Sequence, residues 1–104
     1  SAKVKYETTC PMTFNQPNQA EAATKAAITL LGEDKCNGDI DPRPFSEDFS
    51  IMSENTPGCF VLMGNGTSGS YGKPLHSADY DFNDELLVKG SSYWVELAEQ
   101  QLQK

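Results

Sequence analysis

Apolar residues recur at helical spacing in two long stretches of the chain. In residues 18–32 the pattern predicts an amphipathic helix. Asn18 and Glu21 stand three residues apart as a capping box at its start, and Gly32 supplies its C-terminal stop. The second stretch begins at Asn83, the expected N-cap, and runs to the C-terminus. Its expected buried stripe comprises Leu86, Gly90, Tyr93, Trp94, Leu97 and Leu102.

Three segments carry strand patterns, and a short helix lies between two of them. Residues 3–9 alternate apolar and charged positions, residues 34–44 indicate a short irregular strand, and residues 59–64 (CFVLMG) are continuously apolar, as in a strand buried on both faces. Residues 46–55 predict a helix with Ser46 as N-cap and with Glu47 and Asp48 in its first turn. This alternation of helices and strands predicts an α/β fold.

Composition excludes several classes of partner. The 104 residues carry a net charge of −7 and only 8 Lys and Arg, so the cationic stripe of a nucleic-acid binder is missing and an anionic membrane surface is disfavoured. No apolar run approaches the roughly 20 residues that cross a bilayer. Cys10, Cys36 and Cys59 form neither a CxxC motif nor an even set, which favours reduced, structural cysteines and a cytoplasmic setting.

Candidate chemistry centres on the only histidine, His76, which follows a glycine-rich loop at residues 64–72. Loops after buried strands bind ligands in open α/β sheets, but this one lacks a P-loop signature, and a plain flexible loop explains it equally well. Taken alone, His76 is more often a hydrogen-bonded surface residue than a ligand. Nearby Asp79, Asp81 and Asp84 match no calcium loop and are more simply turn and helix-entry residues. Spacing alone also makes Glu47 and Asp48 complements of the helix dipole.

Taken in order, these stretches resemble a known family. "PFSEDFSIMSENTPGCFVLMGNG" followed by "LHSADYDFNDELLVKGSSYWVELAEQQL" is similar to the C-terminal part of the metal-dependent amidohydrolases, which include hippurate hydrolase, N-acyl-amino-acid amidohydrolases and plant indoleacetyl-amino-acid hydrolases. These enzymes belong to the aminoacylase/carboxypeptidase superfamily of dinuclear metallopeptidases. The resemblance covers nearly the whole chain and is most specific over residues 45–94.

The resemblance implies a role for His76 as the last ligand of a two-metal site. The other ligands and the general-base glutamate would come from earlier in the parent protein, so no catalytic residue is expected within these 104 residues. The chain is then expected to be a fragment of a three-layer zinc-peptidase-like catalytic domain. Residues 1–9 would be the last strand of a lid or dimerisation domain, and residues 15–104 the C-terminal half of the catalytic domain.

The chemistry implied for the parent enzyme is hydrolysis of the amide bond of N-acyl amino acids or related small amides. Two divalent ions (zinc, or manganese, cobalt or nickel) would activate the attacking water. Glu47 and Asp48 would brace the site, while Asn65 and Gly66 would shape the substrate pocket. The resemblance further implies a homo-oligomeric parent joined through its lid domain, and an isolated chain that is inactive and metal-free. The alternative is a self-contained acidic α/β binding or interaction module without catalysis.

Overall fold

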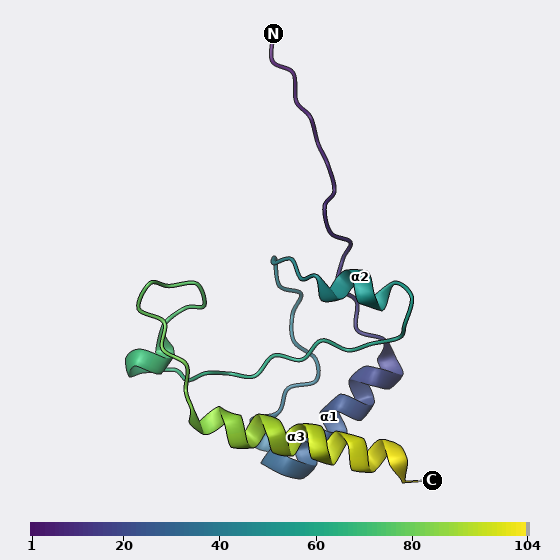
Figure 1. Cartoon of the computed structure of the whole chain (residues 1–104), viewed down its shortest axis with the longest axis vertical. Coiled ribbons are helices and arrows are strands. Elements are labelled where there is room, and N and C mark those ends of the chain that lie inside the picture. The colour runs from purple at the N-terminus through teal and green to yellow at the C-terminus, as the bar shows by residue number, and fades with distance from the viewer. Residues whose placement is uncertain (104) are drawn as a thin grey trace.

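The computed structural model describes residues 1–103 and contains three α-helices and two short 3-10 helices in that range. The elements in chain order are α1 (Pro17–Leu31), η1 (Glu33–Lys35), α2 (Phe49–Ser53), η2 (Gly69–Gly72) and α3 (Glu85–Leu102). α1 and α3 pack against each other, and residues 59–65 run from the region of α2 toward the loop that precedes α3 (Figure 1).

Helix α1 confirms the first predicted helix, although it starts differently. It begins at Pro17, whose fixed φ angle suits the first helical position, and the Asn18–Glu21 capping box does not form. Gly32 ends the helix as expected. Its φ of 89° is readily available to glycine, and its backbone N–H donates to the Ile28 carbonyl at 2.8 Å.

Helix α3 confirms the closing helix, but it begins at Glu85 with Asp84 in the N-cap position, so Asn83, the predicted N-cap, lies one residue earlier. The Asn83 Oδ1 accepts a hydrogen bond from the Glu85 backbone N–H at 3.1 Å, which satisfies a donor that the first turn leaves open. On the predicted stripe Tyr93 is buried, and its hydroxyl donates to the Ala23 carbonyl of α1 at 3.4 Å. Trp94 and Leu102 were predicted to be buried and are exposed, so the stripe is narrower than its spacing indicated.

The helix expected over residues 46–55 is reduced to the five residues of α2. Ser46 does not cap it, because the helix starts at Phe49 and Asp48 occupies the N-cap position without a side-chain hydrogen bond. Ser50 is buried, and its hydroxyl donates to the Glu47 carbonyl at 2.7 Å. The Phe49 ring lies 5.6 Å from that of Phe60, which attaches α2 to the segment after it.

The predicted α/β fold class is wrong for the described residues, because residues 1–103 contain no β-strand. This result removes the strands expected at residues 3–9, 34–44 and 59–64, and with them the helix-strand-helix-strand-helix layer of a three-layer domain. A strand exists only where a neighbouring backbone supplies hydrogen bonds. Residues 61–63 have no such neighbour within residues 1–103 and lie 43–53% exposed instead of buried on both faces.

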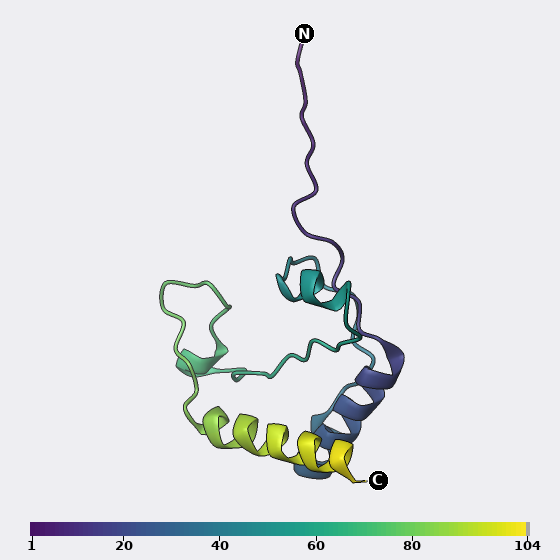
Figure 2. The ribbon, with the colours of Figure 1, turned by 45° about the vertical axis from the view of Figure 1, so that its right-hand side comes forward.

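The described chain leaves much of its surface uncovered. Its accessible surface is 8809 Å², whereas a folded monomer of this mass exposes roughly 5,800 Å². The radius of gyration is 16.9 Å, against about 13 Å for a compact chain of this length. Residues 1–9 contribute to both values, since they extend away from the helices as an exposed tail (Figures 1 and 2). The buried hydrophobic core is limited to Ala23, Ala26 and Tyr93.

Candidate functional site

Residues 65–83 form a loop whose two ends are joined by asparagine side chains. The Asn65 Nδ2 donates to the carbonyls of Tyr71 at 3.1 Å and Asp81 at 2.8 Å. Its Oδ1 accepts from the Asn83 backbone N–H at 2.9 Å, and the Asn83 Nδ2 donates to the Asn65 carbonyl at 3.3 Å. Because the Asn83 Oδ1 also accepts from the backbone N–H of Glu85 in the first turn of α3, this pair of asparagines fastens the loop to the helix.

Gly66 lies where the loop turns back on itself. Its φ is 150°, and a Cβ atom at this position would stand 2.7 Å from the Cβ of Tyr71. A side chain would therefore push the two arms of the loop apart. Gly66 was predicted to shape a substrate pocket. The structure gives it a tight backbone approach, and its contact with a substrate stays a prediction.

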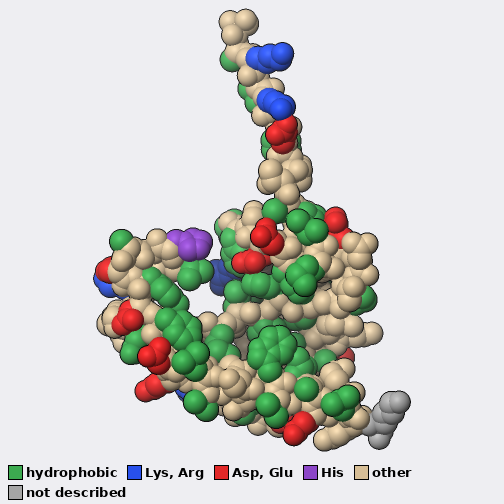
Figure 3. Space-filling model, viewed as in Figure 1, with side chains coloured by type: hydrophobic (Ala, Val, Ile, Leu, Met, Phe, Trp, Pro, Cys, Tyr) green, Lys and Arg blue, Asp and Glu red, His purple; other side chains and the backbone are tan. Residues whose placement is uncertain are grey.

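His76 lies in a tight turn at the far end of this loop. It occupies the second of the two central positions of that turn. The Ser77 backbone N–H donates to the Pro74 carbonyl at 3.1 Å, which closes a turn with His76 at its third residue. The φ of His76 is 68°, in the left-handed region that histidine enters at some cost. The side chain is exposed, and none of the hydrogen bonds within residues 1–103 uses its imidazole (Figure 3, purple). Both ring nitrogens are thus available to a ligand.

Asp79 secures the turn that carries His76. Its carboxylate lies 2.8 Å from the Lys73 ammonium and accepts a hydrogen bond from the Ser77 hydroxyl. The Lys73 contact, followed by the Ser77 contact, holds the pKa of Asp79 below its ordinary value. Asp79 therefore acts as a turn residue, as the sequence favoured. Lys73 was not anticipated, because its partner lies six residues away across a turn with no regular spacing.

The other predicted site residues lie at the start of α2. Glu47 is half-buried and Asp48 is exposed, and the contacts that define this corner are made by the Glu47 backbone carbonyl. Across residues 1–103 no group of three or more His, Cys, Asp or Glu side chains could hold a metal ion. The described residues therefore offer one available imidazole and do not fit a complete metal centre.

A large apolar hollow, which sequence reasoning did not anticipate, lies between α1, α3 and residues 59–65. It has a volume of about 920 Å³, and hydrophobic side chains gather on this face of the molecule (Figure 3). Its wall includes Phe60, Val61, Met63, Leu86, Trp94 and Leu97. Desolvation here raises the pKa of the Cys59 thiol. The pKa of Tyr93 is also raised, first by desolvation and then by the charge of the nearby Cys59.

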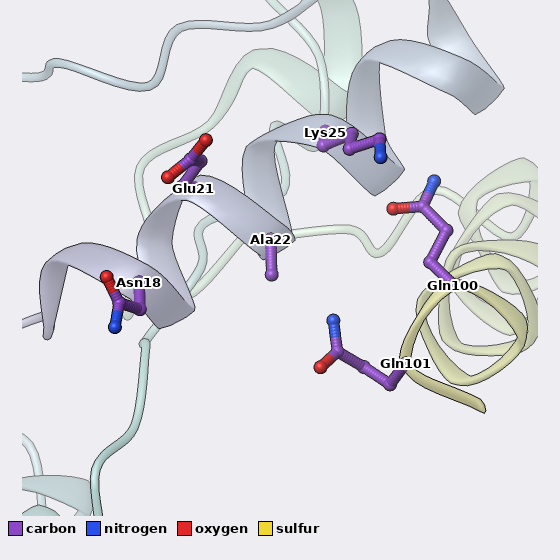
Figure 4. A pocket seen from close by; sticks show the side chains of 6 residues that line it. All are labelled: Asn18, Glu21, Ala22, Lys25, Gln100 and Gln101. Atoms are coloured by element: carbon purple, nitrogen blue, oxygen red, sulfur yellow. The ribbon is translucent and has the colours of Figure 1, made fainter. Parts of the chain in front are cut away.

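A second, smaller hollow is polar and lies where α1 faces the end of α3. Its volume is about 250 Å³, and it is lined by Asn18, Glu21, Ala22, Lys25, Gln100 and Gln101 (Figure 4). The Gln100 Nε2 donates to the Glu96 carboxylate at 2.6 Å and to the Thr29 hydroxyl at 3.3 Å, so this side chain bridges the two helices. The hollow therefore marks a polar helix–helix contact.

None of the helices in the described part is long and apolar enough to cross a membrane.

Known proteins resemble this chain along nearly its whole length. A hippurate hydrolase of Campylobacter jejuni is 31% identical over 96 residues, which are 92% of this chain and 24% of that protein. An uncharacterized hydrolase of Staphylococcus saprophyticus is 30% identical over 98 residues, which are 91% of this chain and 24% of that protein. The chain thus spans about a quarter of the length of these relatives.

No solved structure gives a significant match. The model of peptidase family M20/M25/M40 matches residues 1–100. This match confirms the amidohydrolase-like resemblance carried by residues 45–94, and it supports the description of the chain as part of a hydrolase. Members of the family generally depend on metal ions, although no particular metal follows from the match. The chain belongs to peptidase family M20/M25/M40.

Proposed function

We propose that the chain is part of a metal-dependent amidohydrolase that cleaves the amide bond of N-acyl amino acids or related small amides. The observation that carries this proposal is the 31% identity with a hippurate hydrolase along 92% of the chain. Hippurate is an N-acyl amino acid, so its hydrolysis breaks an amide bond of this class. Because the chain spans 24% of that relative, the proposal concerns the whole protein to which these residues belong.

His76 is proposed to contribute one imidazole ligand to a site for two divalent ions. Its exposed side chain, its left-handed backbone and the Asp79 brace behind it support this role. Two such ions, when bound, supply a water of lowered pKa and stabilise negative charge on the amide oxygen. The remaining ligands and the general base are assigned to parts of the protein outside this chain, because the described residues do not form a complete centre.

Glu47 and Asp48 are proposed to brace the site, while Asn65 and Gly66 shape the pocket beside it. The small substrate would contact the loop that carries His76. The side chain of Asn65 holds the backbone of this loop in place through Asp81 and Asn83. Acidic composition supports the absence of nucleic-acid and membrane partners. Assembly of the whole protein through a lid domain is part of the same proposal.

The decisive experiment removes the imidazole and keeps the backbone. In the complete protein, His76→Asn retains a side chain that tolerates the left-handed φ of 68°, which His76→Ala does not. We expect turnover of hippurate and N-acetyl amino acids to fall by more than about a hundredfold, with loss of bound metal measured by elemental analysis.

The neighbouring Leu75→Ala variant serves as the control, because Leu75 is also exposed and belongs to the same turn. It is expected to keep its metal and most of its turnover. Full activity and full metal content in His76→Asn would refute the assignment.

A further inference from the structure

The Asn65 side chain holds the loop at two points placed symmetrically about His76. Its Nδ2 donates to the carbonyl of Tyr71, five residues before the histidine, and to that of Asp81, five residues after it. Both N–H groups of the amide are used. This one amide therefore closes residues 71–81 into a ring that has the histidine at its middle.

The same side chain also connects that ring to a rigid element. The Asn65 Oδ1 accepts from the Asn83 backbone N–H at 2.9 Å, and the Asn83 Oδ1 in turn accepts from the first residue of α3, Glu85. The bond between the Asn83 N–H and the Asn65 Oδ1 is partly buried, so water competes less with it than with an exposed bond. The position of the ring relative to α3 therefore depends on Asn65.

We propose that Asn65 is the positioning residue for His76, acting through the loop backbone and not by touching the metal or the substrate. The inference rests on the proposed function, in which His76 is a metal ligand. A ligand must be held to within about half an ångström of its productive place, and His76 lies in an exposed turn with little packing of its own. Its placement must then come from the hydrogen bonds that fix the ends of its ring.

The chain provides a matched control in Asn15. The Asn15 side chain brackets the Phe60 backbone in the same two-sided way, donating to its carbonyl at 3.0 Å and accepting from its N–H at 2.8 Å. Asn15 thus binds the beginning of the segment 59–65, whereas Asn65 lies at the end of that segment. Loss of the Asn15 amide removes two backbone contacts and loss of the Asn65 amide removes three, but only Asn65 contacts the ring that carries His76.

The test compares Asn65→Ala, Asn65→Asp and Asn15→Ala in the complete protein. Asn65→Asp keeps an oxygen to accept from Asn83 and loses both donors to the ring, so it isolates the contacts with Tyr71 and Asp81. Zinc affinity is measured by competition with a chelating dye, hydrogen exchange is measured at the amides of residues 66–82, and kcat and KM are determined for hippurate.

We expect both Asn65 variants to bind zinc about 10- to 100-fold more weakly, the range seen when a residue that orients a ligand is removed. Exchange in the loop should accelerate, and kcat should fall more than KM rises. Asn15→Ala should alter stability and leave zinc affinity within about twofold of the wild type. If Asn65→Ala does not fold, Asn65→Asp decides by the same measurements.

Unchanged zinc affinity in a folded Asn65 variant, or an equal loss in Asn15→Ala, would overturn the inference. The His76→Asn variant separates this failure from that of the proposed function. If His76→Asn loses zinc and the Asn65 variants do not, only the positioning role is wrong. If His76→Asn keeps its zinc, the proposed metal ligand itself is wrong.

Discussion

Trp94 makes the uncovered apolar face measurable in the 104-residue chain. It is the only tryptophan, it lies on the wall of the large hollow, and it is 68% exposed. A side chain of this type carries up to about 250 Å² of surface, so roughly 170 Å² of it remains in water. We predict that the chain self-associates through this face and that Trp94→Lys weakens the association.

The magnitude follows from the area. Covering roughly 170 Å² at about 25 cal/mol per Å² stabilises an assembly by up to about 4 kcal/mol for each indole. For each indole that the association buries, that energy corresponds to a change in the dissociation constant of at most roughly a thousandfold. Lysine keeps an apolar stem, and ordering side chains at an interface has its own cost, so we expect a weakening of about tenfold or more.

Sedimentation velocity over a range of protein concentrations measures the association, and tryptophan emission follows the same transition by shifting to the blue as the indole leaves water. Binding of a dye that fluoresces on apolar surfaces should fall in Trp94→Lys. Tyr6→Lys is the matched control, because Tyr6 is an aromatic residue 86% exposed on the extended tail and does not line the hollow. A monomeric, dye-silent wild-type chain with concentration-independent emission would refute the reasoning.

Two further predictions concern the 104-residue chain and its histidine turn. The purified chain alone should not hydrolyse hippurate or N-acetyl amino acids and should bind zinc only weakly by calorimetry, since residues 1–103 place no group of ligands around His76. Tight stoichiometric binding or metal-dependent turnover would contradict this. The turn should also loosen in acid. The pKa of Asp79 is lowered in the folded chain, so its stabilising contribution is complete above the ordinary value of 3.8 and is lost as pH falls through the lower folded pKa. An NMR titration should show this, with Lys73→Met raising the pKa of Asp79; an unchanged pKa in that variant would exclude the Lys73 contact as its cause.

The helices could be predicted from the sequence because their signals are local. Gly32 ends α1 as expected, and Asn83 binds the first turn of α3 from one residue before the N-cap position, so both act within one turn of their helix. The strands could not be predicted in the same way, because a strand depends on a partner that its own residues do not specify. The apolar run at residues 59–64 indicated burial on both faces, yet Val61 and Leu62 are exposed beside the hollow.

The candidate site shows the same division. His76 was singled out by a residue motif, and its role as a metal ligand stays a prediction. Its left-handed backbone, the Lys73–Asp79 pair and the hold of Asn65 on Asp81 were not predicted, because they arise from loop geometry and from contacts between residues distant in sequence. A lone polar residue in a glycine-rich stretch carries no signal of the carbonyls that it will meet.

The ring closed by Asn65 divides the loop into a part that can change length and a part that cannot. Residues 66–70, the exposed outer lobe, lie outside the span from Tyr71 to Asp81, so an insertion there leaves the length of the ring unchanged. It has to spare Gly66, which packs against Tyr71, and the bond from the Gly72 N–H to the Ser68 carbonyl. An insertion within residues 72–80 changes the circumference of the ring and displaces the histidine directly. The outer lobe is therefore the part of the loop in which an insertion leaves the length of the ring that carries His76 unchanged.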